Sequence, residues 1–340
     1  MMKSSFCGTH REVGFHWGAE QLSLGRRLLD EVPFPLTDAR REYADACVPL
    51  YRGHFPEILE EIQGIAEGQH CDAHTLRAVL LGMYAIQPAC SVFAVSDGSG
   101  ALLGRNSDFL TALEPFNLHV GYRLPNASFI GNTTAFVEME DGVNGHGLAA
   151  GLTNVPAHAI APGFNAGMLL RDVLEHCRDV PSALSHIRKV RAASGMVLVL
   201  ADRTGNIALV ERDAGAIEVE FHAGGEGAAF VCAANAFHLP GMRARNLPGI
   251  DNWRAEERYE TLTRALSAPD ARCDAAFARE LLSGGRGFLC QYDRDSGHDT
   301  VWSAVYHPAR GQALLAPGNP MRTAFEEVET MCDSCEYPHG

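Results

Sequence analysis

Pro88-Ala89-Cys90-Ser91-Val92-Phe93-Ala94-Val95 and, slightly later, Gly104-Arg105-Asn106-Ser107-Asp108-Phe109 form the most informative part of this chain. The apolar run after Cys90 predicts a buried strand, and Asp97-Gly98 predicts a hairpin turn behind it. Such a hairpin would return Arg105 and Asp108 to Cys90, although they follow it by 15 and 18 residues. A guanidinium beside a thiol favours the thiolate, which is the attacking species. The alternative interpretation is an inert buried cysteine with an Arg–Asp ion pair on the returning strand.

The segments around this hairpin alternate between groups of helices and groups of strands. Residues 1–89 are expected to be mostly helical, and later helices are expected over 165–179, 181–191, 253–267 and 274–283. Strands are expected within 90–151, 195–222, 231–232, 300–307 and 312–316. Hairpin-linked strands with helices grouped between them predict an α+β architecture, in which helical layers cover antiparallel sheets.

Composition and charge exclude several classes of protein. Of the 340 residues, 46% are hydrophobic, which is enough to bury a sizeable core and argues against general disorder. The net charge of −14 makes nucleic acid and anionic membrane surfaces unlikely partners. No segment approaches the roughly 20 apolar residues of a spanning helix, and the N-terminal residues lack a signal-peptide core. We therefore expect a cytoplasmic protein.

The ten cysteines are scattered along the chain, without the density of a disulfide-rich scaffold. Cys332 and Cys335 have C-x-x-C spacing, and His339 follows them near the C-terminus. A non-catalytic or metal-binding protein that uses these three residues is the alternative to an enzyme. One such pair is a weak zinc signal, because structural zinc usually has four ligands. We expect no metal and no cofactor.

The motif around Cys90 resembles a known enzyme group. A cysteine at the head of a strand, followed by Gly-Arg-Asn-x-Asp and an aromatic residue, is similar to the penicillin acyltransferase and choloylglycine hydrolase group. This group belongs to the N-terminal nucleophile (Ntn) hydrolases and includes acid ceramidase. Residues 144–156 (NGHGLAAGLTNVP) and 234–238 (ANAFH) resemble two later segments of the group, in the same order. The long region ahead of Cys90 is most similar to the acyl-coenzyme A:6-aminopenicillanic acid acyltransferase branch.

The resemblance implies a fold and a maturation step. The implied fold is a four-layer αββα sandwich of two antiparallel sheets covered by helices. Such enzymes cut the peptide bond before the nucleophile, here Ala89–Cys90, so residues 1–89 would become a chain separate from, but associated with, the catalytic domain 90–340. Cleavage frees an α-amine with a pKa of about 7.7–8.0, which can act as the general base for the thiol of the same residue. Ala89 and Ser91 stand where the group often has Gly and Thr.

The resemblance also implies roles for individual residues. Cys90 would be the nucleophile, Arg105 would favour its thiolate, and Asp108 would bind the free α-amine. Asn235, with Asn154 as a second donor, would stabilise the oxyanion.

Other interpretations of the polar residues remain open. Asn154 has the alternative role of a turn residue before Pro156, and Asn235 that of a turn cap. The group also uses an arginine near a helix start to bind substrate, for which Arg254 and Arg258 are both candidates. Arg258 has the alternative role of a surface ion pair with neighbouring glutamates.

The implied activity is hydrolysis or acyl transfer at a linear carbon–nitrogen amide bond, through a thioester on Cys90. The expected partners are a small-molecule amide substrate of the N-acyl amine or N-acyl amino acid type and the 1–89 segment itself. Self-association into a homo-oligomer is left open.

Overall fold

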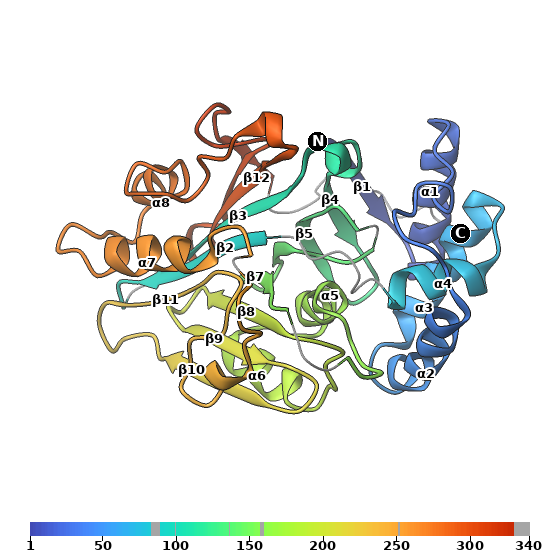
Figure 1. Cartoon of the computed structure of the whole chain (residues 1–340), viewed down its shortest axis with the longest axis horizontal. Coiled ribbons are helices and arrows are strands. Elements are labelled where there is room, and N and C mark those ends of the chain that lie inside the picture. The colour runs from blue at the N-terminus through green and yellow to red at the C-terminus, as the bar shows by residue number, and fades with distance from the viewer. Residues whose placement is uncertain (83–88, 99, 136, 157–159, 251, 330–340) are drawn as a thin grey trace.

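The structure is a computed structural model of the whole chain, and it describes residues 1–340 except 83–88, 99, 136, 157–159, 251 and 330–340 (Figure 1). The described strands form two sheets that pack face to face. Among the described residues, one apolar core lies between the two sheets, and a further core lies on the outer face of each sheet. These cores separate the layers of the fold.

The larger sheet has eight strands among the described residues. Their order across the sheet is β1 (Met2–Cys7), β4 (Leu118–Arg123), β5 (Ser128–Thr133), β6 (Asp141–Asn144), β7 (Leu148–Asn154), β8 (Met196–Asp202), β9 (Ile207–Arg212) and β10 (Ile217–His222). Neighbouring strands are antiparallel, with the exception of β1 and β4, which pair in parallel. The sheet is therefore mixed at one edge, a departure from the purely antiparallel sheet that the sequence predicted.

The smaller sheet has six strands among the described residues. Their order is β11 (Ala229–Ala233), β2 (Ala89–Ser96), β3 (Ala101–Leu110), β12 (His298–His307), β13 (Gln312–Ala316) and β14 (Glu326–Val328). The predicted hairpin is confirmed as β2 and β3, which pair antiparallel around a turn with Gly98 at φ 86°. Alternate side chains of β2 point to opposite faces: Val92 joins the core between the sheets, whereas Phe93 joins the core under the helices.

Helices cover the outer faces of both sheets. Helices α5 (Ala166–His176) and α6 (Val180–Ile187) pack on the eight-stranded sheet, and α7 (Ala255–Leu266) and α8 (Ala275–Leu282) pack on the six-stranded sheet. The four-layer αββα arrangement is therefore confirmed. Helix starts follow the sequence: Asn165 and Asp274 accept hydrogen bonds from the first turns of α5 and α8.

The N-terminal segment holds α1 (His10–Ser23), α2 (Asp38–His54), α3 (Pro56–Gln69) and α4 (Ala73–Leu81), which gather beside β1 at one end of the molecule (Figure 1). Helices α1 and α3 touch through their backbones, because a Cβ added at Gly64 would lie 2.1 Å from the Arg11 carbonyl oxygen. The prediction of a mostly helical segment is confirmed, but it missed β1. Among the described residues, no helix combines the length and the apolar character that crossing a membrane requires.

Candidate active site

The β2–β3 hairpin places the predicted nucleophile beside its arginine. Val92 lies opposite Arg105 in the register, and Cys90 lies opposite Ser107, two residue pairs further along. Arg105 reaches along the sheet and donates from Nη2 to Cys90 Sγ at 2.8 Å. Both side chains are fully buried. The structure thus brings together the two residues that the hairpin predicted to meet.

Two buried carboxylates hold the Arg105 guanidinium in place. Its Nη1 donates to Asp141 Oδ2 at 2.9 Å, and its Nη2 donates to Glu140 Oε2 at 3.1 Å. Its Nε donates to the carbonyl of Leu152 at 2.9 Å. Gly151 leaves room for this side chain, since a Cβ there would lie 3.3 Å from Arg105 Cδ. A buried cation needs such partners, and the sequence analysis missed both carboxylates.

Asp108 lies in the same cluster. It is on β3, beside the first residue of β2, the strand that holds Cys90. It stands opposite Ala89 in the β2–β3 register, and both its side chain and that of Ala89 are buried. Asp108 accepts hydrogen bonds from Thr300 at 2.6 Å and from Tyr292 at 3.0 Å. Burial raises the pKa of Asp108 to about 6, against the opposing effects of Arg258 and these two hydroxyls. Neither Thr300 nor Tyr292 was predicted as a partner of Asp108.

Arg258, one of the two candidate arginines, is fully buried and connects the parts of the site. It donates from Nη1 to the Cys90 carbonyl at 2.5 Å and from Nη2 to Asn235 Oδ1 at 2.8 Å, and its Nη1 lies 3.6 Å from Asp108 Oδ2. Asn235 Oδ1 also accepts the backbone N–H of Cys90 at 2.9 Å. Arg258 and Asn235 thus hold the carbonyl and the N–H of Cys90.

The other two predicted residues are placed differently. Arg254 is exposed at the start of α7, pairs with Glu257 and lies over the ring of Phe288, away from this cluster. Asn154 lies at the end of β7, and its backbone carbonyl accepts a hydrogen bond from Asn235 Nδ2 at 2.9 Å. The contact that joins Asn154 to the site is therefore made by its backbone.

The thiol of Cys90 is protonated at neutral pH in the uncleaved chain. Burial raises its pKa to about 12, and Arg105 and Arg258 oppose that rise whereas Glu140 and Asp108 add to it. Exposing the sulfur to water would remove the largest cause of the rise and leave the arginines in place. The geometry therefore describes a thiol that is positioned beside a guanidinium but is covered from solvent.

Comparison with known families adds an independent finding. Residues 95–322 match the model of the acyl-coenzyme A:6-aminopenicillanic acid acyl-transferase family. The chain belongs to this family. It is an Ntn-type enzyme of the hydrolase and acyltransferase class. The matched range contains Arg105, Asp108, Asn154, Asn235 and Arg258, and it begins after Cys90. No curated protein matches the chain.

Several solved structures are similar to this family member. An N-acylethanolamine-hydrolyzing acid amidase ortholog from Caenorhabditis elegans is 18% identical with a TM-score of 0.47, over 65% of this chain and 93% of that one. Penicillin V acylase from Agrobacterium tumefaciens is 14% identical with a TM-score of 0.47, over 71% and 86%. A mutant conjugated bile acid hydrolase from Clostridium perfringens is 12% identical with a TM-score of 0.44, over 74% and 100%.

The candidate metal ligands of the sequence analysis, Cys332, Cys335 and His339, lie outside the described residues. Within the described part, Asp172, His176 and His186 bring three potential ligand atoms within 4.8 Å of one another. The two imidazoles already contact the Asp172 carboxylate, each at 2.7 Å, so hydrogen bonds satisfy this group. It belongs to α5 and α6, on the outer face of the eight-stranded sheet.

Proposed function

We propose that this family member is a self-cleaving cysteine amidohydrolase or acyltransferase that acts on a linear amide bond through a Cys90 thioester. The observation that carries the proposal is the 2.8 Å contact between Arg105 Nη2 and Cys90 Sγ, in a cluster with Asp108, Asn235 and Arg258. A strand-end thiol beside a fixed guanidinium suits a nucleophile far better than a structural cysteine.

The first step is activation. The Cys90 sulfur attacks the carbonyl carbon of Ala89, the bond from that carbon to the Cys90 nitrogen breaks, and the nitrogen leaves as the α-amine with a proton. Water then hydrolyses the thioester, which frees the thiol and leaves a carboxylate on Ala89. The hydrogen bond from Arg258 to the Cys90 carbonyl and that from the Cys90 N–H to Asn235 hold this segment during the exchange.

Turnover then uses the new α-amine. The amine accepts the thiol proton, and the thiolate beside Arg105 attacks the amide carbon of the substrate. Asn235 donates from Nδ2 to the oxyanion once the substrate replaces its present partner, the Asn154 carbonyl. The α-ammonium returns its proton to the amide nitrogen, and the tetrahedral intermediate expels the amine product and leaves the acyl group on sulfur. Water or an acceptor amine releases the acyl group, which gives hydrolysis or transfer respectively.

The two fragments should stay associated after cleavage, because 1–89 is built into the fold of 90–340. Strand β1 is paired with β4 along its length. His10 of α1 contacts Glu61 at 2.8 Å and Glu175 of α5 at 3.1 Å, and Arg171 of α5 contacts Glu61 of α3 at 2.8 Å. These glutamates raise the pKa of His10 to about 9 although burial acts against them, so the imidazole is charged at neutral pH.

A substrate panel tests the proposed function. We expect the cleaved enzyme to hydrolyse at least one class among N-acyl amines, N-acyl amino acids and N-acylated amino-lactams. The released amine is measured with an amine-reactive reagent. Stopping the reaction with acid should trap the acyl group on Cys90, which mass spectrometry of the digested protein would locate. Amine release that persists with no acyl group on Cys90 would contradict the thioester.

Removing the oxyanion donor should affect the rate and not binding. In Asn235→Ala we expect kcat to fall by roughly 10²–10³ with little change in KM, because the donor matters mainly in the transition state. Asn154→Ala keeps the carbonyl that orients Asn235, so a fall of the same order there would identify its side chain as the second donor. Reduced stability with unchanged specific activity of the folded enzyme would instead identify both asparagines as turn residues.

A further inference from the structure

A row of polar residues crosses the eight-stranded sheet from its edge to the active site. Lys3 of β1 lies opposite His119 of β4, His119 lies opposite Asn132 of β5, and Asn132 lies opposite Asp141 of β6. Directly opposed residues point to the same face of a sheet. We call these four residues the polar row. Its next position is Gly151 of β7, the glycine that makes room for Arg105.

The inner part of the row is a continuous chain of hydrogen bonds. His119 Nδ1 lies 2.8 Å from Asn132 Oδ1, and Asn132 Nδ2 donates to Asp141 Oδ1 at 2.6 Å. Asp141 Oδ2 accepts from Arg105 at 2.9 Å, and Arg105 donates to Cys90 Sγ at 2.8 Å. All of these side chains are at most 9% exposed. A histidine of β4, the strand next to the sheet edge, is thus linked to Cys90 through three buried groups.

The direction of each hydrogen bond is set by chemistry. The Asn132 amide nitrogen faces the Asp141 carboxylate and the Tyr306 hydroxyl, so its oxygen must face His119. His119 must then carry a proton on Nδ1 and donate it. If this donor were lost, the Asn132 oxygen would lose its hydrogen bond to His119, and the buried amide would be held only through its nitrogen. His119 therefore fixes the position from which Asn132 supports Asp141.

Asp141 depends on this support. Its two oxygens accept from Asn132, from Tyr306 at 2.6 Å, from Trp302 at 3.0 Å and from Arg105. Burial beside this carboxylate raises the pKa of Tyr306 well above its usual value, so the phenol stays a donor. Each donor draws charge away from the side of Asp141 that faces Arg105. Losing one leaves more negative charge near the guanidinium, which then stabilises a thiolate less well.

We propose that His119 is a positioning residue for Cys90, which acts by orienting Asn132 and, through Asp141, the guanidinium of Arg105. The proposal rests on the proposed function of Cys90. It assigns the row a role beyond holding the sheet together, because backbone pairing alone would not need four polar side chains in register on an inward face.

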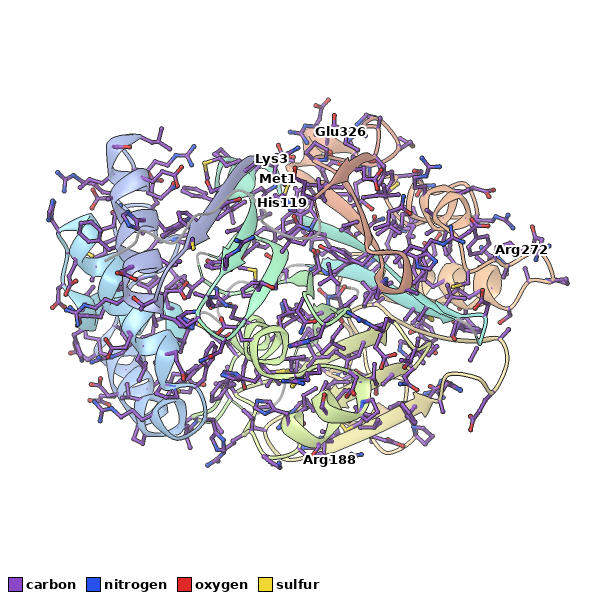
Figure 2. The ribbon with its side chains drawn as sticks, turned by 180° about the vertical axis from the view of Figure 1, so that it is seen from behind. Met1, Lys3, His119, Arg188, Arg272 and Glu326 are labelled. Carbon is purple, nitrogen blue, oxygen red and sulfur yellow. The ribbon has the colours of Figure 1, made fainter. Side chains whose placement is uncertain are left out.

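The outer end of the row is Lys3, which lies on the N-terminal strand β1 beside His119. His119 and Lys3 line a cleft of about 340 Å³ with Ser5 and Glu327, and Lys3 pairs with Glu326 of β14 at 3.7 Å. Figure 2 shows Lys3, His119 and Glu326 gathered at this edge. Burial and, more weakly, Lys3 lower the pKa of His119, so the imidazole is neutral at pH 7, with Asp141 acting in the opposite direction. After self-cleavage, one fragment would therefore cover a residue that tunes the nucleophile of the other.

Three substitutions test whether residue 119 acts as a hydrogen-bond donor or only fills space. In His119→Asn, the side-chain Nδ2 takes the place of Nδ1 and still donates. In His119→Asp, an ionised side chain of the same shape can only accept, and His119→Leu can neither donate nor accept. We expect His119→Asn to keep at least half of the wild-type kcat. We expect the other two to lose roughly ten- to a hundredfold in kcat with KM unchanged, the range for a buried group that loses its partner.

The decisive measurement is the pH dependence of Cys90 alkylation in the cleaved enzyme, followed by peptide mass spectrometry and compared at equal folded fraction. The alkylation profile should move to higher pH in His119→Asp and His119→Leu but not in His119→Asn. Unmoved profiles in the first two, or equal shifts in all three, would overturn the proposal. Where His119→Asp does not fold, His119→Leu decides alone. This readout does not require turnover, so a failure of the proposed function, seen as amide cleavage that persists in Cys90→Ala, is distinguished from a failure of the row.

Discussion

Cys90→Ala should remain a single uncleaved chain without amidase activity, whereas the wild type should separate under denaturing conditions into residues 1–89 and 90–340. In the proposed mechanism the sulfur is the attacking atom both in self-cleavage and in turnover, and no other described thiol has a guanidinium hydrogen bond of this kind. Loss of a covalent nucleophile costs on the order of 10⁴-fold or more in kcat. Intact-mass spectrometry and amine release from one substrate measure both effects.

Cys232→Ala is the matched control. Cys232 is a buried thiol on β11, the strand beside β2, and burial raises its pKa to about 12 as it does for Cys90. Its partner is the Thr263 hydroxyl at 3.6 Å and not an arginine, so the variant should cleave and turn over normally. If the wild type stayed uncleaved and active while Cys90→Ala was inactive, Cys90 would remain the nucleophile, but its α-amine could not be the base. Activity that survives in Cys90→Ala would refute both.

The central hairpin could be predicted because its determinants are local. The apolar run from Val92 to Val95, the Asp97-Gly98 turn and the position of Arg105 are all contained within 16 residues of Cys90. Strand pairing over such a short loop leaves few alternatives, so the meeting of Arg105 and Cys90 followed from the sequence. The layers followed as well, since helical and strand patterns alternate in long blocks.

The groups that surround Arg105 and Asp108 could not be predicted in the same way. Glu140 and Asp141 stand in an acidic stretch that resembles a solvated surface, and they reach Arg105 only because the two sheets pack face to face. Thr300 and Tyr292 reach Asp108 from more than 180 residues away. Burial of a carboxylate is decided by such distant partners, and a single sequence does not specify them.

The edges of the fold show the same limit. Strand β1 has only one buried side chain, Phe6, so its pattern carries little hydrophobic signal, and its partner β4 is more than 100 residues away. Arg254 and Arg258 were indistinguishable in the sequence because the choice depends on the phase of α7. The structure starts the helix at Ala255, which leaves Arg254 exposed and turns Arg258 into the site.

The charge on Asp108 should govern how the α-amine of Cys90 titrates. In the uncleaved chain the pKa of Asp108 is about 6, so the carboxylate is ionised at neutral pH although it is buried. Cleavage would create an amine beside it. An ammonium ion there would lower the pKa of Asp108 below that value, and the carboxylate would in turn raise the pKa of the amine. Thiol and amine would then titrate as a coupled pair.

Asp108→Asn should therefore lower kcat by roughly 10²–10⁴ in protein that is folded and cleaved, because the amine loses the charge that orients it. Since a neutral amide no longer raises the amine pKa, the remaining pH–rate profile should also move to lower pH. His146→Gln and His238→Gln serve as controls and should keep the wild-type profile, because His238 packs on Tyr259 and contacts Glu256, and His146 lies in the turn between β6 and β7. The test is to measure pH–rate profiles of the wild type and these three variants on one amide substrate. If a histidine variant abolished turnover while Asp108→Asn remained active, a Cys–His pair would have to replace the amine as the source of the thiolate.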